Sequence, residues 1–189
     1  MALNKAYTLV IGSGNYFTGP VGTALPAALN TVGEPWENMG HTSLEDILAL
    51  SSEGGEPTVL GTLQSKSLRT TYSARSETFS IILQQFDEAS LRLYYGSNAT
   101  IGSQGELQVP ANNPAPTKAA FLAVFYDGDN AFAFYAPEAE IFRGDDMELS
   151  DTESLAGLPL SVKPLQMGTN DWAYAVTPIK EVTAPVGTP

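Results

Sequence analysis

The chain has 189 residues, with 21 acidic and 9 basic side chains, one histidine, no cysteine and a formal net charge of −12. Without cysteine it can form no disulfide, no thiolate metal site and no cysteine nucleophile, and its charge opposes binding to nucleic acid or to an anionic membrane. The length fits one domain. Only 16% of the residues are charged, which is explained either by burial of surface between subunits or by a surface rich in uncharged Ser, Thr and Gln.

The N-terminal part is predicted to hold a strand over residues 7–11, followed by a stretch without helix or strand periodicity. Glycines and prolines interrupt residues 12–33 repeatedly, and a long irregular stretch is uncommon inside a compact domain. We therefore expect an N-terminal strand and extended arm over 1–35, a β-sandwich domain over 36–178 and an extended, proline-rich tail over 179–189. No apolar run follows Lys5, so a secretory signal is not expected, and no run reaches the length of a membrane span.

Two apolar runs, 47–52 and 58–63, flank the sequence Glu53-Gly54-Gly55-Glu56. A Gly-Gly pair between apolar runs predicts a hairpin that joins them directly. The competing interpretation is a helix, since Ser43-Leu44-Glu45-Asp46 resembles a capping box, and one helical turn can lead into the strand. Alternating side chains over 67–73 and 78–86 predict two further strands, each with one buried face.

One helix is predicted, over about residues 87–95. Asp87 is a good N-cap, Glu88 suits the first turn, and Gly96 provides the left-handed residue that ends a helix. Two turns are not stable alone in water, so this helix is expected to pack on a sheet.

The second half of the chain is again rich in predicted strands. Asp127-Gly128-Asp129 separates two apolar runs, which is a strong hairpin signal. Further strands are predicted at 107–109, 138–143, 147–149, 158–167 and 172–177. The sum is a mainly β fold, a β-sandwich or barrel with one short flanking α-helix.

Several short patterns suggest chemistry but lack its essential parts. Gly12-Ser13-Gly14 lacks the third glycine of a dinucleotide site, and the spacing from Gly14 to Gly19 resembles a P-loop without its lysine. His41 has no nucleophile elbow to serve, Asp127–Asn130 lacks most of a calcium loop, and Asn98-Ala99-Thr100 is a glycosylation sequon without a secretory signal. We expect no catalytic residue, no cofactor and no metal ion.

The negative charge is concentrated in one segment. Residues 127–153 hold nine acids and one base, whereas 64–92 carry a net charge of +1. A carboxylate-dependent hydrolase therefore stays open as a hypothesis. So does a carbohydrate-binding or adhesion module of a virion or cell surface, for which Trp36, Trp172, Tyr94 and Tyr95 are candidate contact residues.

Longer stretches of the sequence resemble a known family. The stretches are Thr18–Pro26, Trp36–Ser43 and the long block Gly61–Phe86, which runs into the predicted helix that ends at Gly96. A looser match over 155–178 includes Pro159–Lys163 and Asp171–Tyr174. In this order they are similar to the major tail protein, the tail tube subunit, of long non-contractile-tailed phages, particularly those that infect mycobacteria.

The resemblance implies a structural virion protein of a β-sandwich tail-tube fold. Six subunits would form a ring, and rings would stack into a hollow tube through which DNA is ejected into the host. Its partners would be further copies of itself, the tape measure protein and the tail terminator and tail tip proteins, with assembly in the host cytoplasm. An acidic channel wall would let DNA slide without sticking, and the candidate channel-facing acids are Glu53, Glu56, Asp127, Asp129, Glu138, Glu140, Asp145 and Asp146.

Overall fold

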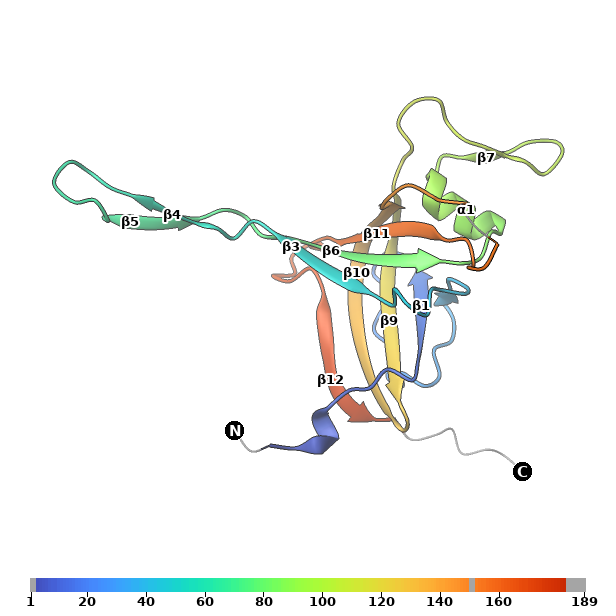
Figure 1. Ribbon diagram of the computed structural model, residues 1–189, viewed down its shortest axis with the longest axis horizontal. Helices are drawn as coiled ribbons and strands as arrows, with labels where there is room; N and C mark the ends of the chain where they lie inside the picture. The colour runs from blue at the N-terminus through green and yellow to red at the C-terminus, as the bar shows by residue number, and fades with distance from the viewer. Residues whose placement is uncertain (1–2, 150–151, 183–189) are drawn as a thin grey trace.

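The computed structural model describes residues 3–149 and 152–182 (Figure 1). A short 3-10 turn, η1 (Lys5–Tyr7), comes first. The strands that precede the helix are β1 (Ser13–Gly19), β2 (Glu37–Asn38), β3 (Ala49–Glu53), β4 (Pro57–Leu60), β5 (Arg69–Tyr72) and β6 (Ser76–Leu83). After the helix α1 (Glu88–Tyr95) come β7 (Thr100–Ile101), β8 (Leu107–Gln108), β9 (Thr117–Asp127), β10 (Asn130–Arg143), β11 (Leu158–Pro164) and β12 (Ala175–Glu181).

Eight strands form one antiparallel sheet in the order β2-β1-β9-β10-β11-β6-β3, with β12 paired to β10 beside this path. The long strand β10 joins the two halves of the sheet, and its register against β9 shifts between Ala136 and Ala139, where the halves meet. Residues 130–135 pair with β12 and residues 139–143 with β11. The strands β3, β6 and β11 consequently cross over β1, β9 and β10 (Figure 1), which confirms the predicted mainly β fold of sandwich type.

The larger core lies between these two layers. Phe79, Ile81 and Leu83 point inward from β6 and are almost fully buried, as the predicted alternation requires. The ring of Phe79 lies 6.0 Å from that of Phe121 and 5.3 Å from that of Phe134, so β6, β9 and β10 share one aromatic cluster. This cluster holds the crossing layers together.

The opposite face of β9 and β10 is covered by residues 20–36, which differs from the arm expected over 12–35. Leu29 is fully buried there, and its carbonyl oxygen accepts a hydrogen bond of 2.6 Å from the Tyr126 hydroxyl. Trp36 is buried beside Tyr135, and its indole N–H donates to the Ala24 carbonyl at 3.2 Å. Irregular backbone is stable here because tyrosine and tryptophan side chains bind it and its own apolar side chains cover the sheet.

The first strand also begins later than predicted. Residues 7–11 form no strand, and β1 starts at Ser13 and pairs with β9 along its whole length. One of the glycines that suggested an irregular arm is explained by close packing, because a Cβ on Gly14 would lie 2.8 Å from the Phe125 ring. Gly14 thus permits close packing within a strand, rather than a turn.

The helix α1 forms as predicted. Asp87 caps it by accepting a hydrogen bond of 2.8 Å from the backbone N–H of Ser90, and Gly96 ends it with a φ of 110°. Tyr94 is buried against β10 and β11, and its hydroxyl donates to the Asp145 carbonyl oxygen at 3.0 Å. The helix therefore covers one end of the sandwich.

Of the other predicted elements, some are confirmed by the structure and some are wrong. The Asp127-Gly128-Asp129 hairpin and the strand at 107–109, which is β8, are confirmed. The strand at 147–149 does not form. Residues 43–46 form no helical turn either, although Ser43 Oγ accepts from Asp46 N–H the hydrogen bond of 3.1 Å that a capping box predicts. The tail expected over 179–189 begins within β12, and its residues 183–189 lie outside the described part of the chain.

Candidate functional site

A long hairpin arm, residues 54–75, extends from the sheet on the side away from α1 (Figure 1). It begins where β3 and β6 stop pairing, at the register partners Glu53 and Ser76, and it contains β4 and β5, which pair only with each other. Nearly all its residues are exposed. A two-stranded ribbon with no layer behind it has marginal stability of its own, so the arm needs stabilising contacts beyond the pairing of β4 with β5.

The connection at Gly54-Gly55 differs from the predicted hairpin turn. The two runs that flank it do not pair with each other, since β3 pairs with β6 and β4 with β5. Gly54 and Gly55 have φ angles of 80° and 74°, and they form a joint that carries the outgoing chain from the sheet into the arm. The true turn lies at residues 61–68, where Leu68 N–H donates to the Leu60 carbonyl oxygen at 2.9 Å.

The joint is fixed by hydrogen bonds between its two chains. The backbone N–H of Glu56 donates to Ser73 Oγ at 3.1 Å, and Arg75 Nε donates to Ser52 Oγ at 2.8 Å. Arg75 also forms an ion pair of 2.6 Å with Glu77. The direction of the arm relative to the sheet is thus set by specific contacts.

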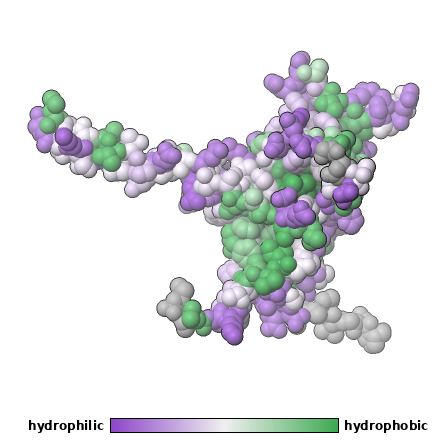
Figure 2. Space-filling model, viewed as in Figure 1, coloured by the Kyte–Doolittle hydropathy of each residue, from purple (hydrophilic) through white to green (hydrophobic). Residues whose placement is uncertain are grey.

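The outer part of the arm, residues 57–73, is apolar and basic. It contains Lys66 and Arg69 and no acidic residue. Five large apolar side chains are exposed along it, and Figure 2 shows apolar residues at its far end; they are Val59, Leu60, Leu63, Leu68 and Tyr72. Exposed apolar side chains gathered on one thin element indicate a contact surface. The alternation over 67–73 predicted strand β5 correctly, but its expected buried face is absent in the single chain.

The candidate channel-facing acids lie in three separate places. Glu53 and Glu56 flank the joint of the arm, and Asp127 and Asp129 lie at the tip of the β9–β10 hairpin. The others lie on the second half of β10 and just after it: Glu138, Glu140, Asp145 and Asp146. The concentration of acids in the sequence therefore does not correspond to one cluster in space.

Two of these acids are paired with bases. Glu140 Oε1 lies 3.5 Å from Lys118 Nζ, and its other register neighbour is Lys163, so this part of the sheet is close to neutral. Asp146 pairs with Arg143. In the described parts of the chain the other six candidates form no ion pair.

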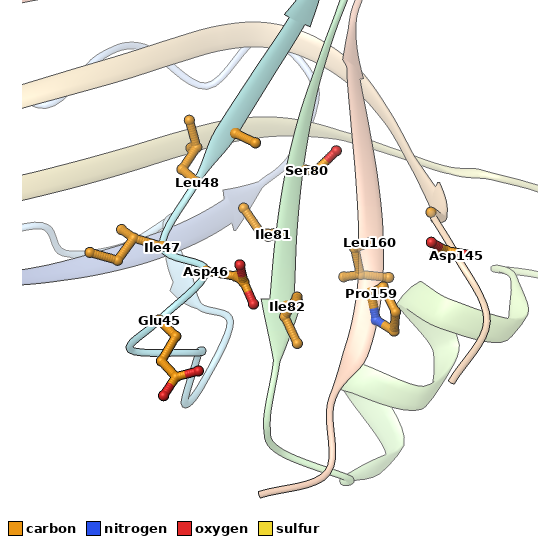
Figure 3. Close-up of a pocket in the computed structure, with 12 residues that line it drawn as sticks. Glu45, Asp46, Ile47, Leu48, Ser80, Ile81, Ile82, Asp145, Pro159 and Leu160 are labelled. Carbon is orange, nitrogen blue, oxygen red and sulfur yellow. The ribbon is translucent and has the colours of Figure 1, made fainter. Parts of the chain in front are cut away.

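A groove runs across the outer side of β6 and β11 beside the residues that lead into β3 (Figure 3). It consists of two adjoining hollows of about 490 and 770 Å³. We call it the acidic groove and define it by the residues that line both hollows, which are Glu45, Asp46, Ile82, Asp145 and Pro159. Figure 3 shows Glu45 and Asp46 on one side and Asp145 on the other, with Ile82 and Pro159 between them.

Sequence reasoning did not identify Glu45 and Asp46 as surface residues of interest. They are separated by about a hundred positions from Asp145, and their pattern suggested a helix start instead. The sequence offered one signal of a surface site, which is that two acids directly follow the large apolar residue Leu44. In the structure the Leu44 side chain is 86% exposed. An apolar residue beside charges is equally common at helix starts, so that signal alone was ambiguous.

The aromatic candidates for sugar binding do not form a platform. Trp36 and Tyr94 are buried, and Tyr95 packs edge-on against Tyr94 at 4.9 Å between ring centroids. Trp172 is 42% exposed but leans on Tyr135. Burial raises the pKa of Tyr94 and of Tyr135, as expected for aromatic residues that serve packing.

The short sequence patterns have structural explanations. The carbonyl oxygen of His41 accepts a hydrogen bond of 2.8 Å from Gln84 N–H beside β6, and Asp127–Asn130 form the hairpin turn. Within residues 3–149 and 152–182, no three histidine or carboxylate side chains gather closely enough to hold a metal ion. None of the helices described here is long and apolar enough to cross a membrane.

Comparison with known proteins agrees with a structural role. A model of the family described as phage tail tube protein matches residues 1–186. Over 173 residues the chain is 35% identical to the major tail protein Gp23 of Mycobacterium phage L5, an alignment that covers 85% of each chain. It is 34% identical, with the same coverage, to the major tail protein Gp23 of Mycobacterium phage D29. The chain therefore belongs to the phage tail tube protein family, and it is a structural component of the virion tail, not an enzyme.

Proposed function

We propose that six copies of the chain close into a ring, that rings stack into a hollow tail tube, and that DNA passes through this tube into the host. The observation that carries the proposal is the hairpin arm, because its apolar side chains are exposed in the single chain and need a neighbour to bury them. A ring that also stacks requires heterologous contacts, in which an element of one copy binds a different surface of the next. The arm is such an element.

The sheet supports the same proposal. Within the described residues, β3 and β12 each pair along one side only, so their other edges are free to pair across a subunit boundary. Exposed edges favour association between chains, and closure into a barrel removes them. Strands of adjacent subunits would then form one continuous wall around the channel.

We further propose that unpaired acids line this channel. Asp127, Asp129 and Glu138 are the strongest candidates, because no base neutralises them in the described structure and all lie on or beside β10, the strand that joins both halves of the sheet. Glu53 and Glu56 are further candidates at the base of the arm. Carboxylates repel the phosphates of DNA. They also do not displace the counterions condensed on DNA, whose release is what drives DNA to bind a basic surface, so DNA would move through the channel without being held.

The channel proposal is tested with assembled tubes. Replacing Asp127 and Asp129 by asparagine removes two negative charges per subunit, and replacing Glu37 and Asp171, two exposed acids outside the candidate set and the groove, by glutamine and asparagine is the matched control. We expect infectious particles with the first pair to eject DNA more slowly at low salt and the control to eject at the wild-type rate. Equal rates in both variants would remove these two aspartates from the channel wall.

The ends of the tube would contact other proteins. We propose that the tape measure protein occupies the channel before ejection, that terminator and tip proteins close the two ends, and that assembly takes place in the host cytoplasm. Co-purification of these proteins with tubes from infected cells tests this part.

The main test is electron microscopy of the purified protein. We expect rings or tubes with a central hole and six subunits per turn. The matched variant removes residues 56–75, so that Gly54-Gly55 directly connects the register partners Glu53 and Ser76 as a two-residue hairpin turn. This variant retains both cores and should stay monomeric. Tubes formed by the shortened chain, or a wild-type protein that never forms a hollow assembly, would overturn the proposal.

A further inference from the structure

We propose that the arm of one subunit binds in the acidic groove of a neighbouring copy. The inference rests on the proposed self-assembly and names the surface that receives the arm. It combines three observations: the chemistry of the arm, the chemistry of the groove, and their positions on the fold.

The groove combines an apolar floor with carboxylates along its sides. Ile82 and Pro159 lie between Glu45 and Asp46 on one side and Asp145 on the other (Figure 3). Two further leucines at its end, Leu44 and Leu155, are 86% and 75% exposed. A groove of this kind fits an extended segment that offers both apolar and basic side chains.

The charge of the groove is not balanced within one subunit. No lysine, arginine or histidine lines either hollow among the described residues. The nearby Arg143 is paired with Asp146, and Glu45, Asp46 and Asp145 form no ion pair. Like charges held together on one surface repel each other, so a basic partner lowers the electrostatic free energy there.

The arm has the complementary chemistry. Lys66 and Arg69 are both exposed, no acid lies among residues 57–73, and Leu63 and Leu68 lie within a few residues of these charges. Binding of this segment would bury leucines on the floor of the groove while the two bases meet its carboxylates. Burial of apolar surface gives the affinity, and the charges select the docking position.

Position excludes an arm that fills the groove of its own chain. The arm leaves the sheet on the side opposite α1, whereas Asp145 and Pro159 of the groove lie beside α1 (Figures 1 and 3). The contact is therefore between copies and of the heterologous kind, which closes rings or extends a stack. The groove that receives an arm is thus a different surface from the arm itself, as assembly of many copies requires.

A charge-reversal exchange tests the pairing. The arm variant carries Lys66→Glu and Arg69→Glu, and the groove variant carries Glu45→Lys and Asp46→Lys. All four side chains are exposed, so thermal unfolding should show both variants folded as the wild type. Each variant alone has an arm and a groove of equal sign, and we expect complete loss of tubes in the electron microscope. Mixed one to one, each arm meets a groove of opposite sign, and we expect tubes with alternating subunits to return.

A control variant changes the net charge as much as the arm variant does, at exposed lysines outside the arm, the groove and the free sheet edges, through Lys5→Glu and Lys118→Glu, and it should form tubes. Tubes from either reversal variant alone would overturn the proposal, as would a mixture that fails to assemble or a control that fails like the arm variant. Absence of tubes from the wild-type chain would instead overturn the proposed function, so the two failures are distinguishable.

Discussion

A side chain at Gly54 would occupy the place of the Ala74 carbonyl oxygen, on the facing chain of the arm. Gly54 has a φ of 80°, a conformation that other residues adopt with difficulty. Close approach and a left-handed backbone therefore coincide at the point where the arm leaves the sheet. Glycine is therefore the residue that fits where the chain passes from β3 into the arm.

Gly54→Ala should abolish tube formation without unfolding the protein. The left-handed backbone costs about 1–2 kcal/mol for an L-residue, and the added carbon displaces the Ala74 backbone, so the arm changes direction. Both cores lie elsewhere, so the protein should stay folded and the thermal unfolding midpoint should fall by only about 2–8 °C. Electron microscopy and amide hydrogen exchange of β4 and β5 measure the two effects. Gly105→Ala is the control, because its φ is 83° but nothing lies within 4 Å of the added carbon. This variant should form tubes. Loss of its tubes would show that the positive φ alone, and not the close approach to Ala74, explains the result at Gly54.

Phe79→Ala should destabilise the fold by about 3–5 kcal/mol, as measured by chemical denaturation. Phe79 is fully buried and contacts the rings of Phe121 and Phe134 across both layers. Phe142→Ala, at a side chain that is 36% exposed, is the control and should cost less than Phe79→Ala, because it removes less buried apolar surface. Equal costs at the two positions would contradict the assignment of the inter-layer core.

Asp87→Ala should lower the free energy of unfolding by about 0.5–2 kcal/mol at pH 7, because Ser90 N–H loses its acceptor. The hydrogen bond from Ser90 lowers the pKa of Asp87 below its ordinary value, so the unfolded chain takes up this proton first. The stabilisation is complete above the unfolded pKa and is lost as the pH falls through the lower folded pKa. The difference between wild type and variant should shrink in acid, whereas Asp87→Asn keeps the cap and should remain close to wild type at pH 7.

Tyr16 should make the protein sensitive to alkali. Its hydroxyl donates to the Ile47 carbonyl oxygen within the core, and burial raises its pKa. Above about pH 10 the unfolded chain loses a proton that the folded chain keeps, so stability that is present below this pH is lost as the pH rises.

Tyr16→Phe tests this linkage. We expect it to cost about 1 kcal/mol at pH 7, through the unpaired Ile47 carbonyl, and to flatten the decline of the unfolding free energy between pH 9 and 11. Tyr7→Phe, at an exposed position, should follow the wild-type curve in denaturant titrations. Parallel curves for all three proteins would show that Tyr16 does not contribute to the pH dependence.

Much of the fold follows from local sequence signals. The alternation in β6, the cap at Asp87, the stop at Gly96 and the Asp127-Gly128 turn all appear where predicted, because each is decided by residues within a few positions. The similarity to tail proteins likewise depends on linear sequence, and the family comparison confirms it. The hairpin arm was not predicted, because Gly54-Gly55 between two apolar runs suggested that those runs pair directly with each other.

The sequence by itself determined the mainly β class, the capped helix, the central hairpin and the family, because these depend on neighbouring residues or on overall similarity. Only the tertiary structure decided that Gly14 lies in a strand, that Gly54 is a joint rather than a turn, and that Glu45 and Asp145 share one groove. The physical reason is the same in each case. Glycine permits a turn, a close approach or a bend with equal ease, and carboxylates a hundred positions apart meet only when strand pairing brings them together.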